Sequence, residues 1–290
     1  MSNIAVRQQP KFSVAIQTDG YKKLINNTLQ DPKRQSRFVA AISSAVAINP
    51  TLQQCEAGSI LTGALLGESL NLSPSPQLGQ YYLVPFDVKT GEKDEKGVDI
   101  KVKKAQFQLG YKGYIQLAIR SGQYKKLNVL AVKEGELVKF DALNEEIEVN
   151  LIEDDIKRET AKTIGYYAMF EYTNGFKKAM YWSKQKMESH ALRYSKGYAA
   201  KKGYTFWEKD FDGMAYKTML RQLLSKWGIM SIDIQQAFEA DLGVIKEDGT
   251  PEYVGDEPDL QPDIPETPEQ TLEQDEVKPG QQQTISMDDI

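Results

Sequence analysis

Cysteine and histidine are nearly absent from the 290-residue chain, which has one of each, Cys55 and His190. A single thiol cannot form an intrachain disulfide framework or a cysteine-rich zinc site, and it suits a reducing compartment. One histidine excludes metal sites built from several histidines, and any Ser-His-Asp triad would depend on His190 alone. The sequence also lacks a charged apolar leader and any apolar run of ~18 residues, so it predicts neither secretion nor a membrane span.

The motifs of common enzymes are missing as well. Gly58 and Gly63 have part of the spacing of a phosphate-binding loop, but no Gly-Lys-Ser/Thr follows them, so we expect no nucleoside triphosphate chemistry. Asp210 and Asp212 lie where a predicted helix begins, and acidic side chains are favoured there as caps. A nuclease needs several convergent carboxylates. We therefore predict a protein that is not an enzyme and has no cofactor or metal site.

Charge is distributed unevenly along the chain. The formal net charge is −5, but residues 1–246 carry 35 basic and 27 acidic side chains, an excess of +8. Residues 247–290 carry one basic and 14 acidic side chains, and Tyr253 is their only aromatic residue. Such a segment buries too little apolar surface to offset its ordering entropy, so we predict an acidic disordered tail. The folded part is basic, which favours a polyanionic partner.

The periodicity of apolar residues predicts one α+β body with an antiparallel sheet and packed helices. We divide the chain into an arm with a short helix outside the core at 1–30, a core at 31–245 and the tail at 246–290. Asp31-Pro32 and Ser183 begin helices, and Asn174-Gly175 joins two strands in a hairpin. The predicted helices cover 31–48, 56–70, 110–121, 183–194, 208–228 and 233–242. The predicted strands cover 80–88, 99–109, 124–134, 136–140, 145–152, 163–173 and 176–182, with a solvated loop at 89–98.

Two basic stretches lie far apart in the sequence. Residues 100–133 contain eight Lys and Arg and no acidic residue, and residues 177–226 contain 12 against four acidic residues. Both stretches are interleaved with aromatic residues. A single strand of nucleic acid needs cations for its phosphates and flat aromatic faces for its unpaired bases. Core packing is the simpler explanation for each aromatic residue alone, but the two stretches together indicate a groove for a polyanion.

Four motifs occur in a characteristic order. They are SLNLSPSP from Ser69, YYLVP from Tyr81, QLGYKGYIQLAIRSG from Gln108 and WEKDFDGMAYKTMLR from Trp207. Together they resemble the RecT family of single-strand annealing proteins, over about residues 31–245, and a member from a phage or prophage of a Gram-positive bacterium.

The resemblance implies binding of single-stranded DNA and annealing of complementary strands in homologous recombination without ATP. It implies homo-oligomers that are rings or helical filaments on DNA, and a fold akin to the ring-forming annealing proteins of eukaryotes. We expect the arm to make oligomer contacts, and the tail to dock a partner, to compete for the DNA groove or only to keep the protein soluble. The implied partners are the annealed duplex, a phage exonuclease and the host single-strand-binding protein, in the cytoplasm of the bacterial host.

We expect one DNA strand to lie in a groove lined by residues 101–126 and 193–221, with its base edges exposed for a second strand. Lys217 and Arg221 share one helix face, which we expect to lie apart from the apolar stripe of that helix. The predicted DNA-binding residues are Lys103, Lys104, Tyr111, Lys112, Tyr114, Arg120, Lys196, Tyr198, Lys201, Lys202, Trp207, Lys209, Lys217 and Arg221. Three alternatives stay open: a structure-specific nuclease, a phage structural or assembly protein, and a protein that protects single strands without annealing them.

Overall fold

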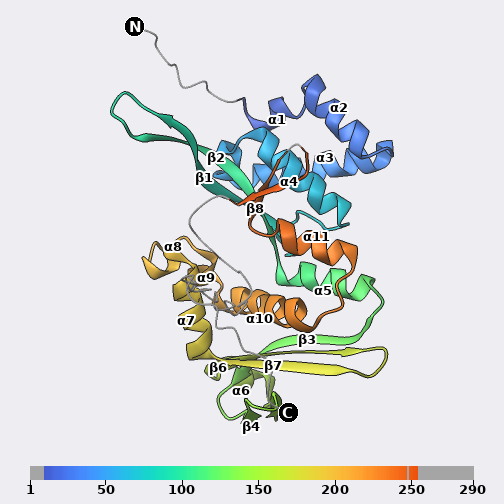
Figure 1. Cartoon of the computed structure of the whole chain (residues 1–290), viewed down its shortest axis with the longest axis vertical. Helices are drawn as coiled ribbons and strands as arrows, with labels where there is room; N and C mark the ends of the chain where they lie inside the picture. The colour runs from blue at the N-terminus through green and yellow to red at the C-terminus, as the bar shows by residue number, and fades with distance from the viewer. Residues whose placement is uncertain (1–9, 247, 254–290) are drawn as a thin grey trace, which may run out of the picture. The chain divides into compact units, whose positions relative to one another are not determined.

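The computed structural model describes residues 10–246 and 248–253 (Figure 1). Over these residues the protein is α+β, and every pair of neighbouring strands is antiparallel, which confirms the predicted fold class. No helix in this part of the chain is long and apolar enough to cross a membrane. Residues 1–9 of the predicted arm, and residues 247 and 254–290 of the predicted tail, lie outside the described residues.

The described chain begins with α1 (Phe12–Ala15), α2 (Asp19–Thr28), α3 (Pro32–Ala47), the 3-10 helix η1 (Leu52–Gln54) and α4 (Ala57–Ser69). As predicted, Asp31 caps α3 by accepting a hydrogen bond from the backbone N–H of Lys33. The prediction that the segment before residue 30 lies outside the core is wrong. Phe12, Ile16 and Ile25 are buried, because α1 and α2 both pack against α3.

A long hairpin follows, formed by β1 (Tyr81–Lys93) and β2 (Asp99–Leu109). Tyr81 pairs with Leu109 at its base, and Lys89 pairs with Lys101 farther out. The predicted solvated loop at 89–98 is exposed as expected but shorter than predicted, because the strands continue to residue 93 and resume at 99. The sequence did not predict these parts of the strands because their side chains are charged. The hydrogen bonds of a ladder are made by the backbone, whatever the side chains are.

A three-stranded sheet forms the second part of the core. It has the order β3-β6-β7 and contains β3 (Tyr124–Lys133), β6 (Thr163–Tyr172) and β7 (Lys177–Ser183). The predicted Asn174-Gly175 turn joins β6 to β7, with Gly175 at φ +89°, a value that glycine adopts without strain. Alternate residues of β6, such as Tyr166, Ala168 and Phe170, are fully buried and face the helices.

An excursion between β3 and β6 holds β4 (Leu137–Asp141), β5 (Glu146–Val149) and α6 (Asp155–Thr160). The fully buried carboxylate of Glu136 fixes its base by accepting hydrogen bonds from Lys133 N, Ile152 N and the Arg158 guanidinium, at 2.7, 3.2 and 2.6 Å. Burial alone would raise the pKa of Glu136, but these hydrogen bonds outweigh it and lower the pKa. The ionised carboxylate therefore holds the end of β3, the chain before α6 and α6 itself together.

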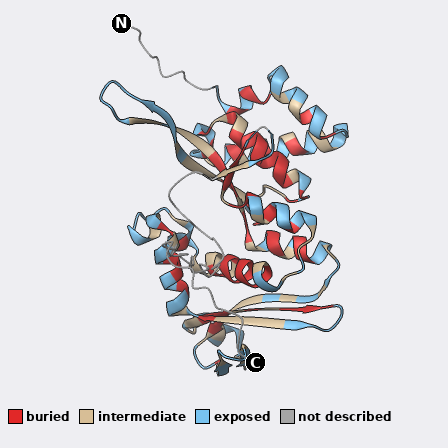
Figure 2. Cartoon of the chain, in the orientation of Figure 1, coloured by how far each residue is buried: buried red, intermediate tan, exposed pale blue. Residues whose placement is uncertain are grey.

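Two helices pack between the hairpin and the sheet. α10 (Phe211–Trp227) lies between α5 (Tyr111–Arg120) and the β3-β6-β7 sheet, and nearly every residue from Ala215 to Leu224 is buried (Figures 1 and 2). The ring of Tyr111, the first residue of α5, contacts that of Tyr216 in α10. About one turn farther along each helix, Arg221 of α10 donates a hydrogen bond to the Tyr114 hydroxyl of α5. The two helices therefore run in the same direction, with their N-terminal ends side by side.

The remaining elements are α7 (Lys184–Tyr194), α8 (Lys196–Ala199), α9 (Phe206–Lys209), α11 (Ile232–Ala240), β8 (Gly243–Ile245) and β9 (Pro251–Tyr253). Ser183 caps α7 as predicted. The predicted helix at 208–228 is divided at Asp210, which ends α9 and caps α10 through Gly213 N. Strand β9 lies within the predicted disordered tail, because pairing with β8 orders the chain as far as Tyr253.

Candidate nucleic-acid interface

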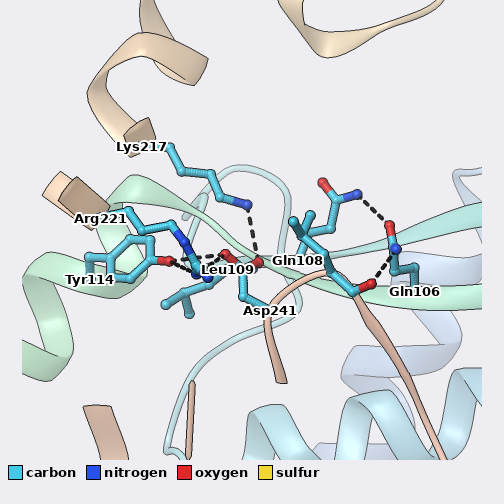
Figure 3. A network of polar contacts seen from close by, with 8 residues as sticks. Gln106, Gln108, Leu109, Tyr114, Lys217, Arg221 and Asp241 are labelled. Carbon is cyan, nitrogen blue, oxygen red and sulfur yellow. Dashed lines mark hydrogen bonds and ion pairs between the residues drawn. The ribbon is translucent and has the colours of Figure 1, made fainter. Parts of the chain in front are cut away.

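A buried polar network joins α5, α10 and the end of α11 (Figure 3). The Asp241 carboxylate, 1% exposed, accepts hydrogen bonds from Leu109 N at 2.8 Å, Tyr114 Oη at 2.9 Å, Lys217 Nζ at 3.1 Å and Arg221 Nη1 at 3.0 Å. Burial, and next the charge of Asp241, raise the pKa of Tyr114, so its hydroxyl stays protonated and donates. One carboxylate thus holds three elements together.

This network corrects the expectation that Lys217 and Arg221 lie on a separate polar face of α10. The two side chains are 4% and 9% exposed, because α10 is covered on one side by α5 and on the other by the sheet. Both cations bind Asp241, so a phosphate could reach them only by opening the core. Tyr114, a predicted stacking residue, is 1% exposed and cannot present a face to a base.

The Gly-Tyr-Lys-Gly sequence at 110–113 is explained by a close approach of two backbones. A Cβ atom added at Gly110 would lie 2.2 Å from the carbonyl oxygen of Gly79, and one added at Gly113 would lie 2.1 Å from that of Gln80. The N–H of Gly110 donates to the Gln80 carbonyl at 2.8 Å. Residues 79–80 therefore pack directly on the first turn of α5, which carries the exposed Lys112.

Replacing Gly113 with alanine should displace this turn. We expect Gly113→Ala to cost about 1–3 kcal/mol of unfolding free energy, because the new methyl group meets a backbone carbonyl that cannot rotate away. That cost lowers the melting temperature by about 2–4 °C per kcal/mol, measured by circular dichroism. Gly20→Ala in α2 is the matched control, since nothing lies within 4 Å of the added Cβ. Equal melting temperatures for the two variants would contradict this reading of the motif.

Lys112 lies beside residues from the second basic stretch. A Cβ atom added at Gly79 would lie 3.0 Å from the Tyr82 hydroxyl and 3.5 Å from the Lys112 side chain, so these two side chains are neighbours. The Tyr82 ring in turn contacts that of Phe206 in α9, with centroids 5.8 Å apart. Burial, followed by the nearby Asp210 and Tyr111, raises the pKa of Tyr82. The N-terminal ends of α5 and α10 thus converge around Tyr82.

The chain between α8 and α9, which leads directly to Phe206, carries further exposed cations. Glu208 accepts hydrogen bonds from Gly203 N, Thr205 N and Thr205 Oγ1 at 2.8, 3.1 and 2.8 Å, which fixes the loop. These hydrogen bonds, that from Gly203 N first, lower the pKa of Glu208 and keep it ionised. We call the resulting surface the Lys112 patch. Its cations are Lys112, Lys201, Lys202 and Lys209, and its aromatic residues are Tyr82, Tyr204 and Phe206.

The other predicted residues of α5, α8 and α9 differ in exposure. Trp207 is 3% exposed, with its ring 5.0 Å from that of Phe211 and 6.5 Å from that of His190, so it is a core residue and cannot stack on a base. Tyr111 and Tyr198 are half-buried, and Lys196 is exposed at the start of α8. His190 is 7% exposed in the same aromatic cluster.

Three predicted cations lie away from the Lys112 patch and contact acceptors of the protein. Lys103 pairs with Asp87 at 2.8 Å, and Lys104 lies 3.9 Å from Glu56, both at the hairpin. Arg120 ends α5, and its guanidinium donates to the carbonyl oxygen of Leu70 at 2.7 Å, just beyond α4. Their contact with DNA stays a prediction.

Three aromatic residues of the patch were not among the predicted DNA-binding residues. Tyr204 is 64% exposed and Phe206 is 43% exposed, whereas the selected Trp207, which directly follows Phe206, is buried. A short helix such as α9 turns consecutive side chains to different faces, so sequence position alone could not separate them. Tyr82 lies on β1 outside both basic stretches, and only its contact with Phe206 reveals it.

Comparisons with known proteins agree with the motifs. A sequence model of the RecT family matches residues 36–259. The uncharacterized protein YqaK of Bacillus subtilis (strain 168) is 41% identical over 222 residues, which cover 77% of this chain and 67% of YqaK. Protein RecT of Escherichia coli (strain K12) is 31% identical over 208 residues, which cover 71% of this chain and 70% of that protein.

Proposed function

Because this chain belongs to the RecT family, we propose that it binds single-stranded DNA and anneals complementary strands without ATP, in homologous recombination. The observation that carries the proposal is the Lys112 patch. It places the exposed Lys112 of the first basic stretch beside Tyr82, whose ring contacts the exposed Phe206 of the second stretch. Cations beside aromatic faces suit a single strand of any sequence, because they contact its phosphates and the faces of its bases.

In this mechanism the lysines of the patch hold the sugar-phosphate chain of one strand. Cations that neutralise phosphates release counterions and lower the repulsion between two approaching strands. The base edges must stay exposed, because a complementary strand has to pair with them. Tyr82, Tyr204 and Phe206 contact base faces rather than edges and keep the strand out of hairpins. Lys217 and Arg221 act indirectly, by holding α5 and α10 together through Asp241.

Assembly extends these contacts along a strand. Several protomers side by side convert modest single-site contacts into tight binding of a long strand. We propose a homo-oligomer, a ring or a helical filament, with residues 1–30 as contacts between protomers and residues 31–245 as the core that binds DNA. The acidic tail at 246–290 is proposed to dock a partner, a phage exonuclease or the host single-strand-binding protein, in the cytoplasm of a bacterial host.

The proposal is tested with two complementary fluorescent oligonucleotides in the absence of ATP. We expect the protein to raise the initial rate of annealing by about 10-fold or more, as expected for charge-assisted association of polyanions, and this gain should fall with added salt. Tight binding with no gain in rate would identify a protector of single strands. Strand scission after addition of a divalent cation would identify a nuclease, and assembly that ignores oligonucleotides would identify a structural protein.

A further inference from the structure

A second basic surface lies at the opposite end of α10. Three segments meet there: the start of β3, the β6–β7 turn and the end of α10. We call this surface the Trp227 patch. Its cations are Lys125, Lys126, Lys177, Lys178 and Lys226, and its exposed aromatic residues are Phe176 and Trp227.

The cations of the Trp227 patch outnumber its carboxylates. Glu171, whose side chain is 6% exposed, has the ammonium groups of Lys125, Lys177 and Lys126 around it at 2.7, 3.6 and 3.8 Å. These lysine side chains are 58%, 65% and 63% exposed. The contact with Lys125 is the main reason that the pKa of Glu171 is lowered. One carboxylate thus gathers three ammonium groups, two of which are in excess.

A second carboxylate organises the part of the patch on the opposite face of the sheet, because Lys178 pairs with the helix-facing Phe170, whereas Lys177 pairs with Glu171. Glu145 contacts Lys178 and lies 3.6 Å from Lys226. The two ammonium groups lie 4.2 and 5.1 Å from the centre of the Trp227 ring, whose side chain is still 36% exposed. Glu146 and Glu148 line the same hollow as Lys177 and Lys178, together with Lys139, so the six lysines exceed the four carboxylates by two positive charges. Such a surface attracts a polyanion.

The patch is held rigidly, because the end of α10 is bound to the sheet. Tyr172 Oη donates to the Trp227 carbonyl at 2.8 Å and accepts from Ile229 N at 2.6 Å. Tyr124 Oη donates to the Ile229 carbonyl at 3.2 Å. The Phe176 ring stacks on that of Tyr172 with centroids 5.8 Å apart and leaves 45% of the residue exposed. The exposed aromatic faces are therefore fixed relative to the strand ends that carry the lysines.

The two basic patches are separate sites. The Lys112 patch lies at the N-terminal end of α10, next to α9, and the Trp227 patch lies at its C-terminal end (Figure 1). The 17 residues of α10 span about 25 Å at 1.5 Å per residue. That distance exceeds the Debye length of ~8 Å at physiological salt, so the two surfaces act on a strand independently.

We infer that the Trp227 patch receives the second, incoming strand during annealing, while the Lys112 patch holds the first. This inference rests on the proposed function, in which two polyanions must be brought together. A protein with one basic surface loses its attraction for a second strand once the first has neutralised that surface. The Trp227 patch lies beyond the reach of that neutralisation and remains positive, so it draws a complementary strand to the loaded protein.

The test removes charge from the Trp227 patch without leaving a carboxylate unpaired. In the triple variant Lys125→Gln, Lys126→Gln, Lys226→Gln, Glu171 keeps Lys177 and Glu145 keeps Lys178. Full-length protein is loaded with one fluorescent oligonucleotide, and its quencher-labelled complement is added at several salt concentrations. The charge-preserving control replaces the same three lysines with arginine. A second control removes equal charge from α3, α6 and the chain before β6, by Lys33→Gln, Lys157→Gln, Lys162→Gln.

We expect the triple glutamine variant to bind the first oligonucleotide within about twofold of wild type, because distant sites without shared partners act independently. Its annealing rate should fall by about 10-fold, with a weaker salt dependence, and both controls should resemble wild type. An unchanged annealing rate overturns the inference. Equal losses in first-strand affinity and annealing also overturn it, because they indicate one continuous site.

Failure of the proposed function would look different, since wild-type protein would then not speed annealing, whether or not it bound the first oligonucleotide. If the triple variant melts at a lower temperature than wild type, Lys226→Gln alone replaces it. Lys226 is 60% exposed, and its partner Glu145 keeps Lys178. A single substitution that slows annealing but preserves first-strand affinity and melting temperature supports the inference, and one that changes none of these overturns it.

Discussion

Asp241→Asn should destabilise the protein by about 3–5 kcal/mol, the usual cost of removing one partner from a buried ion pair. The substitution keeps the size of the side chain but removes the charge that faces Lys217 and Arg221, which are 4% and 9% exposed. Two cations would remain in the core without their carboxylate. With about 2–4 °C of melting temperature per kcal/mol, we expect a decrease of about 6–20 °C by circular dichroism.

The matched control for this prediction is Asp233→Asn at the start of the same helix. Asp233 is exposed in the first turn of α11, where its charge interacts with the helix dipole. That interaction is worth about 0.3–1 kcal/mol, so Asp233→Asn should lower the melting temperature by only a few degrees. If both variants have the same melting temperature, the Asp241 network does not hold α5, α10 and α11 in the way described.

Replacing the four cations of the Lys112 patch with glutamine should abolish most of the affinity for single-stranded DNA. The variant carries Lys112→Gln, Lys201→Gln, Lys202→Gln and Lys209→Gln. Exposed ion pairs contribute up to about 1 kcal/mol each, so four lost phosphate contacts weaken binding on the order of 100-fold. The slope of log affinity against log salt should become shallower by about 2–3 units, at ~0.7 per contact. Fluorescence anisotropy with labelled oligonucleotides measures both quantities.

The loss should be nearly the same for oligonucleotides of different sequence, because phosphate contacts carry no base information. Arginine at the same four positions keeps the charge and should keep most of the affinity. All four side chains are exposed, so the melting temperature should stay close to that of wild type. An unchanged salt slope would remove the Lys112 patch from the DNA interface, whatever happens to annealing.

Local signals predicted the boundaries of several elements well. Asp31, Ser183 and Asp210 cap helices in the structure, and Asn174-Gly175 turns between two strands. Each signal rests on contacts within a few residues, so it does not depend on the rest of the fold. The hairpin strands beyond residue 88 were missed because their ladder is formed by the backbone, while their charged side chains resemble those of a loop.

The candidate site was predictable in composition but not in arrangement. Residues of the two basic stretches do come close together, at both ends of α10, and a single groove along them stays a prediction. Lys217 and Arg221 share a helix face as predicted, yet their burial depends on Asp241, which is 20 residues from Arg221 in the sequence. A sequence pattern reports which side chains share a face of one helix. It does not report that a second helix and a sheet cover every face of α10.

Burial of α10 between Ala215 and Leu224 makes the helix fix the distance between its two ends, which carry the basic patches. Inserting or deleting one residue would shift everything beyond it by ~1.5 Å and rotate it by ~100°, which would misalign either end with α5 or the sheet. The spacing of about 25 Å matches roughly seven nucleotide steps of a B-form strand at ~3.4 Å each. A chain of this architecture can therefore change the spacing only in whole helical turns, three or four residues at a time.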